Sequence, residues 1–227
     1  MLPFPPLDIV ALCCFVAAWS AYAIAVEWTN RGKDSLNARM DRYRAKWMHR
    51  MLARDMRMVD MQIMASLQNG TAFFASTSLL AVGGALTLLR STEEILAVVG
   101  DLPLAIAATR GQWEAKTIGL TVIFVYAFFK FAWSYRLFNY VAIMLGATPP
   151  PAEKDTAEAA EHIRRTTLLF ESAGRHFNRG QRAFFFALGY LGWFAGPYPL
   201  MAATLAVVVV MWRRQFASES RRAISGD

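Results

Sequence analysis

The chain has 227 residues, of which 56% are hydrophobic and only 18% are charged, and its formal net charge is +7. A soluble domain carries about 25% charged residues, so this composition argues against a soluble fold. The apolar residues form long runs, which is typical of a polytopic membrane protein. The basic residues fall in particular loops rather than on one face. We therefore expect an all-α transmembrane helical bundle with no nucleic-acid partner.

The first apolar run, Leu7–Trp28, is long enough to cross a bilayer. The stretch that includes its start, MLPFPPLDIV, lacks the basic region of a signal peptide, so we expect the run to be kept as an anchor. Its adjacent cysteines, Cys13 and Cys14, would point about 100° apart on a helix. They therefore predict neither a disulfide nor a metal site.

The segment 31–61 carries nine lysines and arginines against four acids. Such a basic loop is expected on the cytoplasmic side, which puts the N-terminus outside. Ser35 is a candidate N-cap. Residues from Trp47 through Met61 to Gln68 recur at alternating spacings of four and three. This spacing predicts one face of an amphipathic helical segment over 35–66.

Seven of the eleven methionines lie between Met40 and Met64. Met-x-x-Met pairs beside His49 could bind Cu(I), whereas flexible thioethers also fill irregular gaps in packing. The pairs lie among hydrophobic neighbours along one predicted face, which favours packing. We expect no metal and no cofactor.

The stretch Met58–Arg90 begins as a charged helix and runs without a proline into an apolar span. Polar side chains stand where it enters the membrane, and such groups are costly unless they have partners or touch water. The loop that follows, 90–116, is expected outside. It contains STEEILAVV, a short helix with a capping box formed by Ser91 and Glu94, and DLPLAIAAT, which is too short to span.

The third span begins at Thr117 and contains Lys130, about 20 Å further along the helix. Lys130 could extend to the inner interface, which Trp133 marks. It could instead be a buried cation paired with an acid, and Glu27 and Asp60 are the acids nearest in depth. Both interpretations stay open.

A proline run at 149–151 ends the third helix, and an amphipathic cytoplasmic helical segment is predicted over 152–182. The last apolar block, Ala183–Trp212, would measure about 45 Å as one helix, which is too long for a straight span. Because Gly196, Pro197 and Pro199 interrupt it, we predict a helical hairpin that returns the basic C-terminus to the cytoplasm. A hairpin that crosses only partly and a single kinked helix are the alternatives.

These predictions give one membrane domain over 1–227, with spans at about 7–28, 67–89, 117–138, 183–195 and 199–213. This topology brings polar residues from several segments to one depth near the cytoplasmic face. The candidate site is this polar cluster: Asp60, Gln62, Gln68, Asn69, Thr71, Ser76, Lys130, Arg136, Asn139, Asn178 and Arg182.

Three motifs carry a resemblance to a known family. They begin at Lys130 (KFAWSYRLFNY), at Phe177 (FNRGQRAFFF) and at Asn69 (NGTAFFAST). Over roughly residues 5–218 the chain resembles the uncharacterised bacterial and plant membrane family called domain of unknown function 599. The resemblance implies an integral membrane protein, and it implies no activity, cofactor or substrate.

The sequence contains no Ser-His-Asp order, HExxH motif or phosphate loop, so we expect no catalytic residue and no enzyme. Two functions remain. One is an oligomeric channel or transport-like protein whose polar cluster lines a path. The other is a structural or accessory subunit whose cluster fixes helix packing and whose cytoplasmic helices dock a partner. We expect a multi-pass protein of the bacterial inner membrane, with a periplasmic N-terminus. Its expected partners are anionic lipid headgroups and a second copy or another membrane protein.

Overall fold

The structure is a computed structural model that describes residues 4–94 and 109–225. Within these residues every regular element is a helix. The long helices are α1 (Pro6–Glu27), α2 (Leu36–Leu52), α3 (Met58–Arg90), α5 (Arg110–Gly146), α6 (Ala157–Tyr190) and α7 (Pro197–Phe216), followed by the short α8 (Glu219–Ser225). Short 3-10 turns cover Asn30–Asp34, Pro151–Glu153 and Leu191–Ala195. The predicted helix STEEILAVV and the DLPLAIAAT segment lie mostly outside the described residues.

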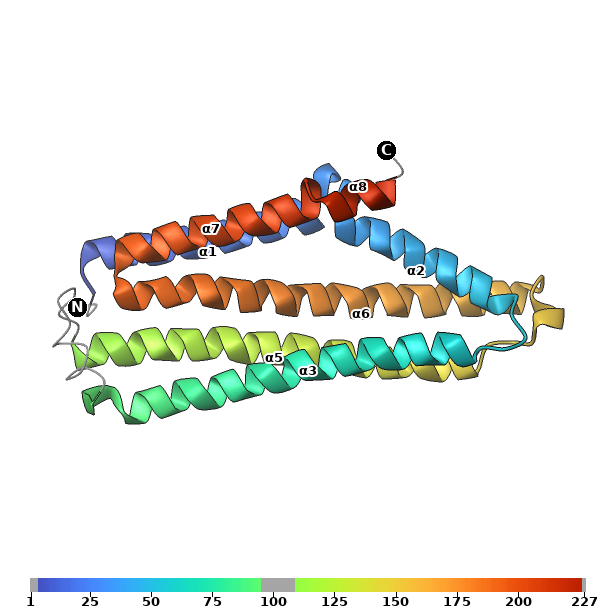
Figure 1. The fold of residues 1–227 in the computed structure, drawn as a ribbon, viewed down its shortest axis with the longest axis horizontal. Coiled ribbons are helices and arrows are strands. Elements are labelled where there is room, and N and C mark those ends of the chain that lie inside the picture. The colour runs from blue at the N-terminus through green and yellow to red at the C-terminus, as the bar shows by residue number, and fades with distance from the viewer. Residues whose placement is uncertain (1–3, 95–108, 226–227) are drawn as a thin grey trace.

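The helices form one elongated bundle, as Figure 1 shows. Helices α3, α5 and α6 lie along its long axis, with α5 packed between the other two. Helices α1 and α7 pack together over one half of α6, and α2 packs on the other half. The start of α1 and the α6–α7 connection therefore share one end of the bundle, and the α2–α3 and α5–α6 connections share the opposite end.

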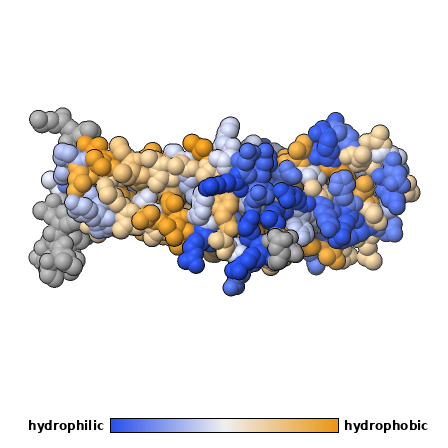
Figure 2. All heavy atoms as spheres, turned by 90° about the horizontal axis from the view of Figure 1, so that it is seen from above, coloured by the Kyte–Doolittle hydropathy of each residue, from blue (hydrophilic) through white to orange (hydrophobic). Residues whose placement is uncertain are grey.

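The two halves of the bundle differ in polarity, as Figure 2 shows. We call the half that contains α1 and α7 the apolar half and the half that contains α2 the polar half. Within residues 4–94 and 109–225, four segments are long and apolar enough to cross a membrane: Pro6–Glu27, Met58–Arg90, Arg110–Gly146 and Pro197–Ile224. The 22 residues of α1 measure about 33 Å, close to the hydrocarbon thickness of about 30 Å. These features indicate an integral membrane protein with an all-α fold.

Helix α5 has 37 residues, so at about 1.5 Å per residue it is about 20 Å longer than α1. The polar half therefore projects beyond a bilayer that fits α1. Helix α6 begins in the polar half with charged residues and ends in the apolar half. The predicted amphipathic segment and the predicted fourth span up to Tyr190 thus belong to one continuous helix, and the rest of that span, 191–195, is a 3-10 turn.

Local signals in the sequence account for several helix ends. The Ser35 hydroxyl accepts a hydrogen bond from the amide of Ala38, as predicted for an N-cap. Thr109 and Gln112 form a complete capping box at the start of α5. At the α6–α7 reversal Gly196 has a φ of 117°, a backbone angle that residues with a Cβ atom rarely adopt. The last apolar block therefore forms a helical hairpin, and the single kinked helix is not observed.

One sequence expectation is wrong. The predicted amphipathic face from Trp47 to Gln68 requires one continuous helix, but α2 ends at Leu52 and α3 starts at Met58. The chain reverses between these helices, so α2 packs on α6 and α3 packs on α5, and the two do not form one rod. The arginines between the two helices stabilise the reversal: Arg54 donates to Asp60, and Arg57 donates to the carbonyls of Thr148 and Pro149.

Among the residues that the structure describes, the buried side chains form two hydrophobic clusters. The apolar half is centred on aromatic side chains such as Phe15, Phe131 and Phe186, and the ring of Trp19 stacks on Phe186 at a centroid distance of 5.1 Å. The polar half contains Met48, Met51 and Met64, all fully buried among residues of α5 and α6. This burial supports the packing interpretation of these methionines.

Candidate functional site

The predicted polar residues do not form one cluster among the described residues. Asp60 is fully buried in the polar half, where its Oδ1 accepts hydrogen bonds from Trp47 Nε1 and Arg54 Nη1, both at 2.6 Å. Gln68 donates to Asn139 Oδ1 at 2.7 Å and joins α3 to α5. These contacts hold helices together at two separate levels of the bundle.

Lys130 and Arg136 make cation–π contacts with aromatic side chains of their own helix, α5. Lys130 Nζ lies 5.0 Å from the centre of the Tyr126 ring. The Arg136 guanidinium lies between Trp133 and Tyr140 and donates through Nε to the Tyr140 hydroxyl at 2.6 Å. This arrangement is typical of cations that extend toward a membrane interface. Lys130 forms no ion pair with Glu27 or Asp60, whose partners are arginines.

The other predicted site residues of α3 lie on different faces of the helix. Gln62, Asn69 and Ser76 are exposed, whereas Thr71 is buried and donates to the carbonyl of Leu67 at 2.8 Å. The predicted cluster is therefore divided between the inward and outward faces of this helix.

Asn178 and Arg182 come together at a cavity of about 460 Å³. We call this hollow the interfacial cavity, because it lies where α1 ends at the boundary between the two halves. Its walls come from the ends of α1 and α7, the 3-10 turn after α1, the start of α2 and the middle of α6. A smaller hollow of about 100 Å³ adjoins it and shares Tyr22, Asn37 and Arg182.

The centre of one wall is an ion-pair triad. The Glu27 carboxylate accepts hydrogen bonds from Arg179 Nη2 at 2.6 Å and from Arg179 Nε at 3.1 Å. It also accepts a hydrogen bond from Arg182. The Arg182 side chain is 9% exposed and that of Glu27 is 23% exposed. Glu27 thus fixes the orientation of two guanidinium groups from α6, and both arginines line the cavity.

The cavity carries more positive than negative charge. Its lining includes four cations, Lys33, Arg175, Arg179 and Arg182, and two acids, Glu27 and Asp41. Asp41 pairs with Arg44 of its own helix, and burial raises the pKa of the Asp41 carboxyl. Arg175 has a looser contact, 3.7 Å from Glu171. Arg214 lies in the adjoining hollow, 5.2 Å from the Phe185 ring centre.

The walls of the cavity are also amphipathic. Tyr22, Val26 and Met211 come from the ends of the apolar helices, and the Tyr22 hydroxyl donates to the Met211 carbonyl at 3.3 Å. Amide side chains from Asn37, Asn178 and Gln215 complete the lining. A ligand here would meet hydrocarbon on one side and cations with hydrogen-bond donors on the other.

A second polar group lies at the opposite end of the apolar half, and the sequence analysis missed it. Asp8 of α1 and Lys116 of α5 are both buried. Trp193 Nε1 donates to Asp8 Oδ1 at 2.6 Å, and Lys116 Nζ donates to the Trp193 carbonyl at 2.8 Å and lies 3.8 Å from Asp8. These groups satisfy one another, which makes the trio a clamp between three segments. The available signal was an acid, Asp8, two residues after the Pro5-Pro6 pair and inside the first apolar run.

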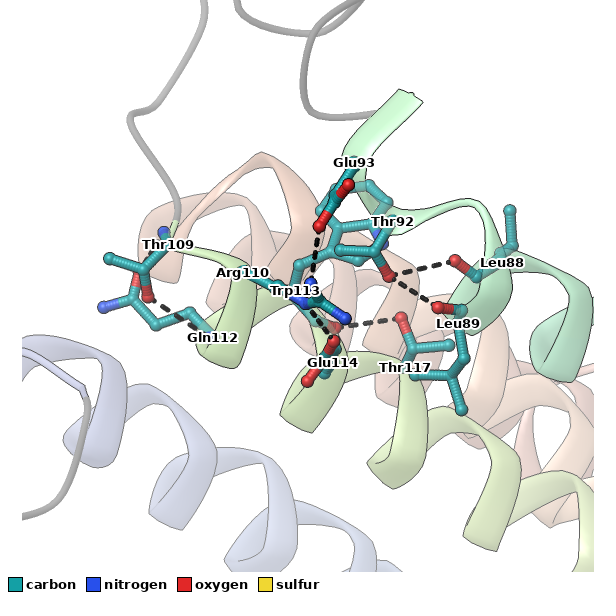
Figure 3. Close-up of polar contacts among 10 residues, drawn as sticks. All are labelled: Leu88, Leu89, Thr92, Glu93, Thr109, Arg110, Gln112, Trp113, Glu114 and Thr117. Carbon is teal, nitrogen blue, oxygen red and sulfur yellow. Dashed lines mark hydrogen bonds and ion pairs between the residues drawn. The ribbon is translucent and has the colours of Figure 1, made fainter.

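At the same end of the bundle, an exposed ion pair joins the residues that follow α3 to the start of α5 (Figure 3). Arg110 contacts Glu93 at 2.5 Å and Glu114 at 2.7 Å. The Thr92 hydroxyl donates to the Leu89 carbonyl at 2.9 Å, and Thr117 donates to that of Trp113 at 2.9 Å. Exposed ion pairs of this kind contribute little to stability. We therefore assign these polar contacts no binding role.

Across the described ranges, no group of three or more His, Cys, Asp or Glu side chains could hold a metal ion. The fold and the interfacial cavity define a polytopic helical membrane protein with a basic, amphipathic hollow. The family model for the protein of unknown function DUF599 matches residues 10–220, and the chain belongs to this family. No curated protein and no solved structure matches the sequence.

Proposed function

We propose that this membrane protein binds an anionic lipid through the interfacial cavity. The observation that carries the proposal is the juxtaposition, in one hollow of about 460 Å³, of an apolar wall at Tyr22, Val26 and Met211 with the cations Arg175, Arg179 and Arg182. Arginine presents a fork of donors that matches phosphate oxygens. The apolar wall provides the start of a path for an acyl chain.

The proposed orientation places the polar half in the cytoplasm. The nine lysines and arginines of residues 31–61 belong to this half and its connection to α1, and such residues concentrate on the cytoplasmic side. The N-terminus is then periplasmic in a bacterial inner membrane. The cavity faces the cytoplasmic leaflet, whose anionic lipids attract basic residues with about 1 kcal/mol per well-placed cation.

Binding to the purified full-length protein in detergent tests the proposal. The probes are short-chain phosphatidylglycerol, short-chain phosphatidylcholine and inorganic phosphate. We expect phosphatidylglycerol to bind most tightly. We also expect the double variant Lys33→Gln/Arg175→Gln to weaken its binding by as much as about 30-fold, because two cations at about 1 kcal/mol each are removed.

The matched control is Arg164→Gln/Arg165→Gln. It removes the same charge from the same protein, but both arginines are exposed and pair with Glu161 away from the cavity lining. Equal binding of both lipids, or equal loss in the two double variants, would contradict the proposal. Tight binding of inorganic phosphate alone would identify a soluble anion as the ligand instead.

A structural or accessory subunit is the second candidate. The contacts Trp47–Asp60 and Gln68–Asn139 support it, because both polar pairs join different helices. Purification in mild detergent should then yield one stoichiometric protein partner. The channel suggested by the sequence receives less support, since its polar residues occupy separate places, and ion flux in proteoliposomes tests it directly.

A further inference from the structure

The outward face of α3 carries a regular pattern of residues, none of which lines the interfacial cavity. Eight residues recur at alternating spacings of four and three, and each of them is exposed within the part of the chain that the structure describes. We call them the outer seam. They are Gln62, Ser66, Asn69, Phe73, Ser76, Leu80, Gly83 and Thr87. A repeat of this period keeps one helix face toward a partner helix in a left-handed crossing.

The inward face of the same helix shows what such a pattern does in this protein. Met64, Thr71, Ser78 and Ala85 follow one another at intervals of seven, and all four are buried where α3 packs on α5. Small and hydroxyl side chains at this interval therefore already serve as a helix-packing surface. Asn69, Ser76 and Gly83 repeat the interval and the chemistry on the outward face.

Much of the outer seam lies in the apolar half. Phe74 contacts the rings of Phe177 and Phe184 on α6, with centroid distances of 5.6 and 6.4 Å. Arg182, which marks the boundary of the two halves, lies between those two positions in sequence. Residues after Phe74 are therefore within the apolar half, where hydrocarbon offers no hydrogen bond to the Ser76 hydroxyl. The Thr87 hydroxyl donates to the Gly83 carbonyl of its own helix at 3.1 Å.

The shape of the outer seam also suits another helix better than lipid. Phe73 is 66% exposed and Leu80 is 76% exposed, and they alternate with the small Ser76 and Gly83. Large residues beside small ones form the ridges and hollows that interlocking helices use. Helix α3 lies at the edge of the bundle beside α5, away from α1 and α7, so a partner can approach it without covering the interfacial cavity (Figure 1).

We propose that the outer seam packs against the outer seam of a second copy of this chain, with the two α3 helices parallel. Copies inserted with the same topology are related by an axis along the membrane normal, so each residue meets its own copy at the same depth. The outer seam carries no charged residue, so this pairing brings no like charges together. Amides and hydroxyls both donate and accept hydrogen bonds, which makes Gln62, Asn69 and Ser76 complementary to themselves.

Cysteine crosslinking in native membranes tests this pairing. In a Cys13→Ser/Cys14→Ser background, Asn69→Cys, Ser76→Cys and Gly83→Cys are oxidised one at a time. Leu79→Cys, 56% exposed on another side of α3, and Leu205→Cys, 65% exposed on α7, are the controls. We expect disulfide-linked dimers of the chain at the three seam positions and a clear loss of that product at both control positions.

Seam cysteines that crosslink no more than the controls would overturn the proposal. A product that contains a different protein would also overturn it, because the occupant would then not be a second copy. Ser76→Ile provides a second measurement by light scattering in mild detergent, where we expect the particle to change from the mass of two chains to that of one. A dimer that persists in Ser76→Ile would contradict the seam assignment. Lipid binding by this variant reports separately on the interfacial cavity.

Discussion

Arg182 of α6 donates a hydrogen bond to the Glu27 carboxylate at the end of α1, although 155 residues separate them in the sequence. Arg179 completes the triad from one turn earlier on α6. The contact fixes the end of an apolar helix against a helix that continues into the polar half. It also determines how two cations face the interfacial cavity, so structure and proposed binding depend on the same carboxylate.

Replacing this carboxylate should lower stability. In Glu27→Gln the two arginines lose their common partner while they stay mostly buried. We expect a loss of about 1–3 kcal/mol, between the values for exposed and fully buried pairs. Thermal unfolding in detergent, followed by tryptophan fluorescence, measures the change. Glu161→Gln is the control, because its arginine partners are exposed and it should leave the midpoint unchanged. Equal midpoints for both variants would contradict a structural role for the triad.

The clamp formed by Asp8, Lys116 and Trp193 predicts that the effects of replacing Asp8 and Lys116 on stability depend on each other. Lys116→Met leaves the buried Asp8 carboxylate without its cation, and we expect a loss of about 3 kcal/mol. The double variant Asp8→Asn/Lys116→Met removes both charges and should recover part of that loss. A double-mutant cycle on unfolding free energies gives the interaction between the two residues. Additive losses would show that the two side chains do not act as a pair.

His176 predicts how stability depends on pH. Burial lowers the pKa of its imidazole, and the nearby Lys130, Arg179 and Arg175 lower it further, against an opposing effect of Glu27. Below about pH 6.5 the unfolded histidine then binds a proton more readily than the folded one, so stability falls as the pH falls. We expect His176→Gln to reduce the loss of stability between pH 7 and pH 5. His49→Gln, at an exposed position on α2, should keep the wild-type slope.

Sequence reasoning located the helices better than it located the site. Residues 58–90 are predicted to run without a break into the membrane, and α3 does so, whereas its start at Met58 contradicts the expected continuation from Trp47. Hydrophobic length sets the depth of each residue, but it does not set rotation about the helix axis. Asp60 and Gln62 are adjacent in depth yet about 200° apart around α3, so the first is buried and the second is exposed.

The same limit explains the residues that sequence reasoning missed. Glu27 was recognised as an acid near the boundary, but only the packing of α1 on α6 selects Arg179 and Arg182 over Lys130 as its partners. Asp8 and Lys116 stand at the ends of predicted spans, where charged residues are ordinarily solvated. Their burial depends on the turn of residues 191–195, which places the Trp193 indole and carbonyl between them.

Gly196 makes the last prediction, because the hairpin depends on its backbone. Its φ of 117° and ψ of 177° belong to a region that only glycine adopts readily, and a Cβ there costs about 1–3 kcal/mol. The hairpin orients both α7 and the Trp193 segment, so Gly196→Ala should lower the unfolding midpoint. Gly70→Ala is the matched control, since a Cβ at Gly70 meets no atom within 4 Å and alanine favours a helix interior over glycine by up to about 1 kcal/mol. We therefore expect the two alanine variants to shift the midpoint in opposite directions. A Gly196→Ala protein as stable as the wild type would mean that the reversal between α6 and α7 adopts a different backbone from the one described.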